Sequence, residues 1–348
     1  MMIPIILDTQ FHRIAEIDYY SSFIWATRYY TCGEFELCVP VDENTTTIFK
    51  NDYYVIRDDD PAHMGVIEKI KIEKLKDDKE RAIISGRFLS CFLGRRIIAV
   101  QTQVYGSVQS CIQTLINQNA ISPSIAARTI PNLIFSSEVQ SSYTMQAQFT
   151  GDNLLEAISE ICRTYGIGFK TMLNSNGKFE FTLFEGTDRS YAQSVNPYIV
   201  FSNDYDNLIS SEYEESKQDM VTDVLIAGEG EGLDRKTLWA TKEAPTGLGR
   251  YELYQDARNA STNEGEISDE VYYQQLRGEA LESITTFTSA FAGQVDFSNI
   301  RFGTDINIGD ICTIKNNRWG LSINVRLVEV IESVSESGKY TITPSFGI

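Results

Sequence analysis

The chain has 348 residues, with 48 acidic and 30 basic side chains and a formal net charge of −18. This length suits two or three domains of ordinary size, and the 42% apolar content excludes global disorder. The acidity argues against a nucleic-acid reader, which needs Lys and Arg on one face. No apolar run approaches the ~20 residues that span a bilayer, and residues 1–10 lack the basic region of a signal peptide.

The first part of the chain resembles a series of short antiparallel strands. Segments 34–40 and 65–72 alternate polar and apolar side chains, which is typical of half-buried strands. Turn signals recur about every 8–12 residues, a spacing typical of a barrel or sandwich. We therefore predict a β-barrel-like domain over residues 1–104.

The middle of the chain has a mixed pattern. Apolar residues at helical spacing predict a first helix over 107–116. A second helix is predicted to start at Asp152 or Asn153, both good N-caps, and to stop at Gly166. Two strands joined by an Asn-Gly turn follow this helix. Residues 105–185 are therefore predicted to form a small α+β domain.

The last part is strand-rich again, and residues 186–348 are predicted to form a second β-barrel-like domain. Ser268 is a good N-cap and Gly293 a good stop, which predicts a long helix over 268–292. Residues 241–266 are polar and are expected to form a long loop. The expected buried stripe of the helix, at spacings of three and four, is Tyr273, Leu276, Ala280, Ile284, Phe287 and Phe291.

The predicted fold class is therefore α+β and β-rich. Two antiparallel β-barrel-like domains, which may exchange strands with each other, flank the small α+β domain. Strand is expected to exceed helix, because Tyr, Phe, Ile, Val and Thr are abundant and favour strands.

The residues present no clear catalytic constellation. His12 and His63 are the only imidazoles, and no G-x-S-x-G nucleophile elbow occurs. The acidic run 58–60 lacks the spacing of a calcium loop and indicates a solvated turn. Asp204 and Asp206 suit a cation or an Asx turn equally well.

The other candidate motifs also favour structural roles. Gly228, Gly230 and Gly232 alternate with two glutamates, whose charge would repel phosphate, so a flexible turn is expected. No cysteine lies in a C-x-x-C pair, which favours buried thiols over a disulfide or a zinc site. Those cysteines are Cys32, Cys38, Cys91, Cys111, Cys162 and Cys312. We therefore assign no catalytic, cofactor-binding or metal-ligating residue and expect no cofactor.

Several stretches, in order along most of the chain, resemble the tail hub or tail-tip proteins of Gram-positive phages. This siphovirus-type family is related in fold to the baseplate hub of contractile tails. Segment 235–266 matches least. The stretches that carry the resemblance are YSSFIWATRYY at 20–30, GEFEL at 33–37, GVIE at 65–68, SGRFLSCFLGRRII at 85–98, NLLEAI at 153–158, GIGF at 166–169, GTDRS at 186–190, VFS at 200–202, DNL at 206–208, GDICTI at 309–314 and RLVEV at 326–330.

The resemblance implies a structural protein rather than an enzyme. It implies a homotrimeric ring at the distal end of a tail tube, in a virion tail or a phage-derived tail particle made in the host cytoplasm. Two barrel-like domains per subunit would match the sixfold tube to a threefold spike or tip. The implied partners are the tube or a distal tail protein, the spike or tip protein and the tape measure protein, with DNA only passing through and no membrane insertion.

Two other functions compete with this structural hub. In the first, aromatic side chains and the loop 235–266 bind cell-wall carbohydrate of the host. In the second, a pair of carboxylates degrades the wall, but with 48 acids such a pair has little specificity. The acidity itself has two explanations: carboxylates lining a channel would repel passing DNA, or exposed charge keeps the particle soluble.

Overall fold

The computed structural model describes residues 2–60, 63–74, 80–210, 212–262, 267–285, 288–292, 295 and 300–347, with backbone alone for 288–292. Strand exceeds helix over these residues, as predicted. The α-helices are α1 (Thr45–Ile48), α2 (Val108–Ile116), α3 (Leu154–Tyr165) and α4 (Asp269–Glu282). The strands are β1 (Pro4–Leu7), β2 (Arg13–Glu16), β3 (Ser22–Arg28), β4 (Glu34–Pro40), β5 (Tyr54–Arg57), β6 (Met64–Lys74), β7 (Glu80–Phe88), β8 (Thr102–Ser107), β9 (Leu133–Ser137), β10 (Thr144–Phe149), β11 (Gly168–Leu173), β12 (Phe179–Phe184), β13 (Val200–Ser202), β14 (Glu212–Ser216), β15 (Asp223–Ala227), β16 (Thr237–Thr241), β17 (Glu252–Asp256), β18 (Thr288–Ala292), β19 (Ile311–Asn316), β20 (Leu321–Ser335) and β21 (Tyr340–Gly347).

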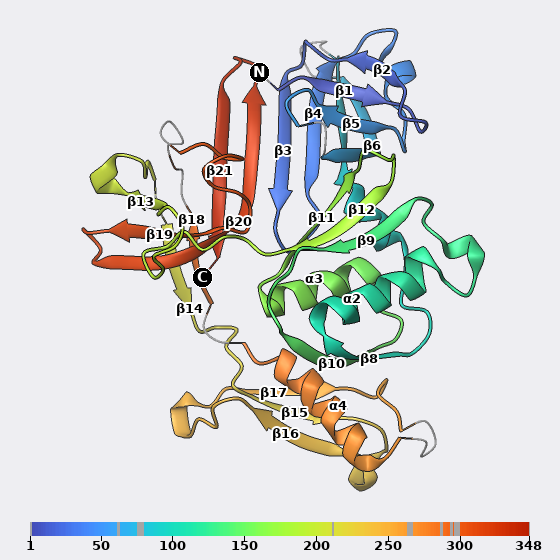
Figure 1. Ribbon diagram of the computed structural model, residues 1–348, viewed down its shortest axis with the longest axis vertical. Coiled ribbons are helices and arrows are strands. Elements are labelled where there is room, and N and C mark those ends of the chain that lie inside the picture. Colours follow the sequence, from blue (N-terminus) through green and yellow to red (C-terminus); the bar gives the residue numbers. More distant parts are fainter. Residues whose placement is uncertain are drawn as a thin grey trace.

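One sheet of 13 strands joins the two ends of the chain. Its main path runs β14-β18-β21-β20-β3-β4-β7-β6-β5-β1-β2, and β19 pairs with β20 and carries β13 on its other side. The long strand β20 lies antiparallel to β3, so the C-terminal strands continue the N-terminal ones without a break (Figure 1). We call this pairing the β3–β20 junction.

The sheets formed by the described residues are not closed barrels, which corrects the predicted barrel-like domains. For the N-terminal strands to form a closed barrel, β3 would have to pair with the strand at the other end of their order, β1 or β2. It pairs instead with β4 on one side and with β20 on the other. The hydrogen bonds that would close a barrel are thereby used to join the two halves of the chain.

The middle of the chain forms the predicted α+β unit of two helices. Asn153 caps α3, because its side-chain oxygen accepts the backbone N–H of Leu155 at 3.1 Å. Gly166 ends the helix in the left-handed conformation, with φ of 68°. The predicted hairpin is β11–β12, and β9 adds a parallel strand to it. The helices α2 and α3 lie beside this sheet and the β8–β10 pair (Figure 1).

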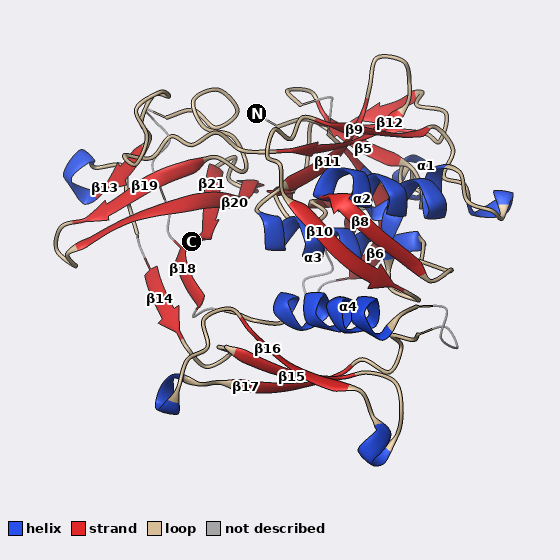
Figure 2. Cartoon of the chain, turned by 60° about the horizontal axis from the view of Figure 1, so that its bottom comes forward, coloured by secondary structure: helices blue, strands red, loops and turns tan. Residues whose placement is uncertain are grey.

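A further small unit is inserted between β14 and β18. Strands β16, β15 and β17 form a three-stranded sheet, and α4 covers one face of it (Figure 2). The predicted loop over 241–266 is thus partly wrong, because β17 lies within it. The parallel pairing of β17 with β15 joins residues that are far apart in sequence, and the polar sequence of this segment gave no alternation to reveal it.

The predicted helix over 268–292 is also wrong in length. Ser268 caps it as expected, but α4 ends at Glu282 with Ser283 as its C-cap. The run of Thr and Phe that follows favours extended backbone, and residues 288–292 form β18 between β14 and β21.

The buried face of α4 differs from the predicted stripe by one residue at its start. Tyr272, Leu276 and Ala280 are buried against the sheet, whereas Tyr273 remains 37% exposed. Ile284 packs at the edge of the same cluster. Phe287 lies outside the described residues, and of Phe291 only the backbone is described, so the expected burial of both stays a prediction.

The buried apolar side chains of the described residues form three cores. The largest runs from the N-terminal strands into the α2–α3 unit without interruption and includes Val334 of β20. The second lies among the C-terminal strands, and the third lies between α4 and its sheet. The small unit therefore has a core of its own, while the first two predicted domains share one.

Candidate functional site

The β3–β20 junction is held by buried charge as well as by the sheet. Arg57 on β5 is 5% exposed, and its Nη1 lies 2.6 Å from Glu332 on β20. Asp59 binds the same guanidinium at 2.8 Å, and the Tyr340 hydroxyl donates to Glu332 at 2.5 Å. Burial alone lowers the pKa of Arg57, but the two carboxylates outweigh it and the net shift is upward. These contacts fix strands from opposite ends of the chain.

A second ion-pair group spans the same junction. Arg28 on β3 donates from its Nε to Glu329 on β20 at 2.7 Å and from its Nη2 to Glu34 on β4 at 2.5 Å. The three side chains are partly buried or exposed, so this group is screened by solvent more than the Arg57 group is.

Tyr29 lies where three parts of the chain meet. Its hydroxyl donates to the Gly166 carbonyl at 3.0 Å and accepts the Gly186 N–H at 3.3 Å. A Cβ added to Gly168 or Gly309 would lie 2.1 or 2.2 Å from the Tyr29 ring, so both positions need glycine for this close packing. Burial raises the pKa of Tyr29 to about 12, so the phenol stays neutral.

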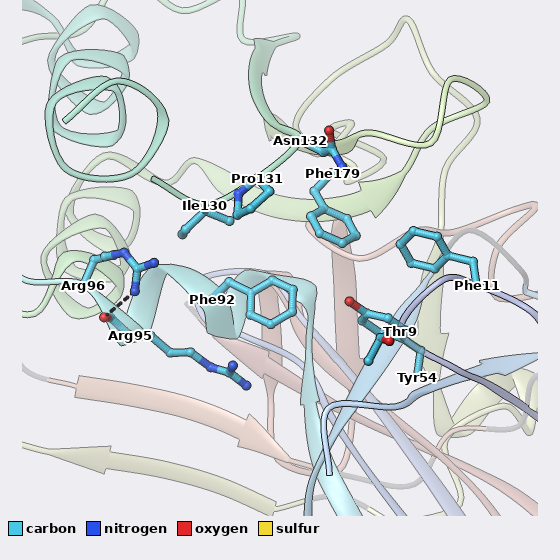
Figure 3. A pocket seen from close by; sticks show the side chains of 10 residues that line it. All are labelled: Thr9, Phe11, Tyr54, Phe92, Arg95, Arg96, Ile130, Pro131, Asn132 and Phe179. Carbon is cyan, nitrogen blue, oxygen red and sulfur yellow. Dashed lines mark hydrogen bonds between the residues drawn. The ribbon is translucent and has the colours of Figure 1, made fainter. Parts of the chain in front are cut away.

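An aromatic hollow of about 390 Å³ lies between the β1–β2 turn, the segment Leu89–Arg95 and the β9–β12 pair (Figure 3). Arg95 lies over the Phe92 ring at 4.9 Å and contacts Asp52 at 3.2 Å. The lining of the aromatic hollow contains no His, Cys, Asp or Glu, which suits an apolar group rather than acid–base chemistry. The residues that line it are Thr9, Phe11, Tyr54, Phe92, Arg95, Arg96, Ile130, Pro131, Asn132 and Phe179.

A row of apolar side chains crosses the three-stranded sheet of the small unit. Leu225 on β15 pairs with Trp239 on β16 and with Tyr254 on β17. Trp239 is 46% and Tyr254 is 56% exposed, whereas the alternate residues of β15 are buried against α4. Arg250 lies over the Trp239 ring at 4.8 Å, and Arg235 donates to the Tyr254 hydroxyl at 2.8 Å. We call this surface the aromatic row; the sequence analysis did not find it, because it depends on strand β17.

The two histidines have structural neighbours. His12 is exposed, with its Nδ1 3.2 Å from Asp8. His63 is partly buried, with its Nδ1 2.8 Å from Asp60. Neither ring contacts a nucleophilic Ser or Cys in the hydrogen bonds of the described residues.

The acidic candidates hold chain segments in place. Asp58 accepts the Ile3 N–H at 2.8 Å, Asp59 binds Arg57 and Asp60 binds His63, so the run 58–60 fixes the turn after β5. Asp204 contacts the amide of Asn317, and Asp206 has a left-handed backbone conformation with φ of 53°. In the described part of the chain, no group of three His, Cys, Asp or Glu has the arrangement of a metal site.

The glycine and cysteine candidates also lie in structural positions. The Gly228 carbonyl accepts a hydrogen bond from the Arg235 Nε, and the Glu229 carboxylate accepts one from the Thr262 N–H at 2.9 Å. These two contacts fix the turn after β15. The six cysteines are all buried and form no disulfide. Burial raises the pKa of Cys38 and of Cys111, among others, so these thiols are not reactive thiolates. No described helix is long and apolar enough to cross a membrane.

The fold of the chain is that of tail proteins. The tail protein of Neisseria meningitidis MC58 matches with a TM-score of 0.57 and 13% identity, covering 100% of this chain and 96% of that one. Prophage tail protein gp18 of Listeria monocytogenes EGD-e matches with a TM-score of 0.56 and 11% identity, covering 99% of this chain and 94% of that one. The 43 kDa tail protein of prophage MuSo2 from Shewanella oneidensis matches with a TM-score of 0.55 and 12% identity, covering 99% of this chain and 97% of that one.

The sequence itself places the chain in a family of phage tail proteins. The model of the siphovirus ReqiPepy6 Gp37-like proteins matches residues 3–348, and the chain belongs to this family. The resemblance to phage tail proteins is thereby confirmed, and with it a place in the virion tail or a phage-derived tail particle. No curated protein matches the sequence.

Proposed function

We propose that this chain is a non-enzymatic hub, three copies of which form a ring that joins the tail tube to the spike or tip. The observation that carries the proposal is the β3–β20 junction, which makes one continuous sheet from both ends of the chain. A subunit that transmits force between tube and spike needs such continuity, and two ion pairs to β20 reinforce it, the buried pair Arg57–Glu332 and the partly exposed pair Arg28–Glu329.

The division of the sheet into two similar portions supports a change from the sixfold symmetry of a tube to the threefold symmetry of a spike. On one side of the junction lie seven strands, from β3 to β2, and on the other side lie six, from β20 to β14 with β19 and β13. Each subunit thus offers two portions of similar size. Three subunits would present six such portions to a sixfold tube and three equivalent faces to a spike.

The acidic edge of the sheet favours contacts through side chains rather than through added strands. Strand β14 ends the sheet path, and Glu212, Glu214 and Glu215 are all exposed on it. Charged side chains on an edge strand oppose pairing with the edge of another chain. We therefore expect ring contacts to use loops and sheet faces.

The proposed ring surrounds a channel through which DNA passes without being bound. A net charge of −18 per chain suits a wall that repels phosphate. Its neighbours in the particle would be the tube or a distal tail protein, the spike or tip protein and the tape measure protein. Exposed acids that only keep the particle soluble would explain the charge without such a channel.

Electron cryo-microscopy of tails that contain this protein tests the hub directly. We expect a threefold ring between the tube and the spike, with carboxylates on its inner wall. A bore lined mainly by Lys and Arg would refute the channel, and a position on the side of the tail would refute the hub. We also expect no clearing of peptidoglycan in zymography.

The aromatic row supports a second candidate function, binding of host cell-wall carbohydrate. Exposed aromatic rings beside polar side chains give sugars an apolar face and hydrogen-bond partners at once. Binding to purified host cell walls should fall about tenfold or more in Trp239→Ala. Trp319→Ala removes a tryptophan that is 50% exposed but lies outside the row, and it should bind as the wild type does. Equal binding by both variants would exclude the row as a sugar site.

A further inference from the structure

An acidic pocket of about 240 Å³ lies where the small unit meets the α2–α3 unit. Helix α4 approaches strand β10 closely here, because Gly278 has no side chain: a Cβ would lie 3.1 Å from the Gln146 carbonyl oxygen. Figure 2 shows α4 between its own sheet and the strands β8 and β10. The pocket is therefore lined from both units, and whatever occupies it contacts both.

Four carboxylates line this pocket without a cationic partner. Asp152 follows β10, Glu160 lies on α3, and Glu279 and Glu282 lie one turn apart on α4. Among the ion pairs of the described residues, those at this pocket belong to Asp256, and the nearest cation to these four is the exposed Lys242, which acts on Glu282 without forming an ion pair. The fifth carboxylate, that of Asp256, differs from them because Arg235 binds it at 2.5 Å.

A buried amide in the same pocket also lacks a partner. Gln275 on α4 is 6% exposed, yet no donor among the described residues reaches its Oε1. A buried acceptor left without a donor costs free energy, so such groups are normally satisfied. By contrast, the neighbouring amide of Gln255 is used fully, since it donates to Glu279 at 2.9 Å and accepts from Ser283 at 2.8 Å. Asp152 and Glu279 each accept one neutral N–H, from Thr150 and Gln255, but neither has a cationic partner. The unpaired acceptor and these carboxylates therefore favour the same kind of group, a cationic donor.

We propose that this pocket binds a primary alkylammonium group, supplied by a polyamine or by a lysine side chain of a partner protein. An ammonium carries three N–H donors and one positive charge. Its three donors match the Gln275 Oε1 and two of the carboxylates, and its charge would offset part of the negative charge of the pocket. Nothing in the proposed hub function requires this site, so it goes beyond that proposal.

An ammonium fits the pocket better than a bare metal ion does. The described acidic side chains are too dispersed to ligate one ion, since no group of three could hold a metal. A compact cation needs ligands within about 2.0–2.6 Å. An ammonium on a carbon chain uses longer hydrogen bonds of about 2.7–2.9 Å and lays its methylenes along the walls.

Binding of the ammonium should depend on pH through Glu282. Burial, followed by the charges of Glu160 and Glu279, raises the pKa of Glu282 to about 7, while Lys242 acts in the opposite direction. Burial and the charge of Asp152 likewise raise the pKa of Glu279. An ammonium would favour the ionised form, so binding should release protons near neutral pH and weaken as the pH falls.

The test is calorimetric titration of the purified full chain with two probes, spermidine and Nα-acetyl-lysine amide. We expect saturable binding at one site per chain near about pH 8, weaker near about pH 6. Glu282→Gln and Gln275→Leu should each weaken it about tenfold, as expected for loss of a charge-assisted hydrogen bond. Glu156→Gln, on the exposed face of α3 outside the pocket, should bind as the wild type does.

Each outcome decides the proposal. Binding of only one probe supports the ammonium site and assigns its source, a free polyamine or a protein lysine. Binding of neither probe overturns it, as does unchanged binding by folded Glu282→Gln and Gln275→Leu. Equal heats from magnesium chloride would also overturn it, because they indicate general cation attraction. Should Glu282→Gln fail to fold, Glu160→Gln removes an exposed carboxylate of the same pocket and takes its place.

Discussion

Arg57 and Glu332 are 275 residues apart in sequence, yet their side chains meet at 2.6 Å and both are almost fully buried. Arg57 also lies over the ring of Trp25, 5.9 Å from its centroid, so the guanidinium contacts the core on one face. A buried ion pair is expensive to form and very expensive to break, because removal of one partner leaves the other charge without compensation. We therefore infer that the pair helps to specify the pairing of the N-terminal strands with β20.

Breaking this pair should destabilise the chain strongly. We expect Glu332→Gln to lower the free energy of unfolding by about 3 kcal/mol, at the low end of the range for a broken buried pair, because Arg57 would keep only the half-exposed Asp59 as a charged partner. Urea titration measures the change. Arg81→Ala removes an exposed ion pair with Glu73 and should change stability little. Similar small losses in both variants would contradict a stabilising role for the buried pair.

The packing of Tyr29 predicts a difference between two glycines. Gly309 and Gly338 both have positive φ, of 91° and 75°, but only Gly309 lies against the Tyr29 ring; the space beside Gly338 is open. Both Ala variants carry the backbone strain, and Gly309→Ala adds a clash with a fully buried ring. We expect it to cost about 1–3 kcal/mol more than Gly338→Ala in thermal or urea unfolding. Equal losses of unfolding free energy in the two variants would show that the Tyr29 ring moves aside at no cost and would contradict this prediction.

Glu282 predicts a loss of stability as the pH rises. Its pKa is about 7 in the folded chain and its usual value is 4.5. Below 4.5 both states hold the proton, and between these values only the folded state does, so stability falls as the pH rises through this window. For Glu282→Gln the decline from about pH 5 to about pH 8 should be smaller than in the wild type, by about 2–4 kcal/mol. Glu156→Gln should keep the wild-type decline, and an identical decline in Glu282→Gln would contradict the assignment.

The sequence predicted those helix ends that depend on interactions between neighbouring residues. Asn153 and Gly166 mark the ends of α3 because capping needs only neighbouring backbone groups. The same is true of Ser268 at the start of α4. The tail-protein family was also within reach, because many short blocks keep their order over most of the chain.

Features that depend on distant residues were out of reach of such reasoning. The closure of β3 onto β20 rather than into a barrel joins segments some 300 residues apart, and nothing in either strand indicates its partner. Likewise residues 288–292, predicted as the end of the α4 helix, form β18 between β14 and β21. The aromatic row depends on the pairing of β15 with β16 and β17, and the acidic pocket depends on the approach of α4 to β10, so neither could be predicted from local sequence signals.

We expect three copies of this chain to form the ring between tube and spike. Native mass spectrometry of the purified protein, mixed with its tube and spike proteins, tests it most directly. We expect complexes that contain three copies, about 118 kDa of this chain, from a subunit of 39.3 kDa. A chain that remains at 39.3 kDa in the presence of both partners would contradict it.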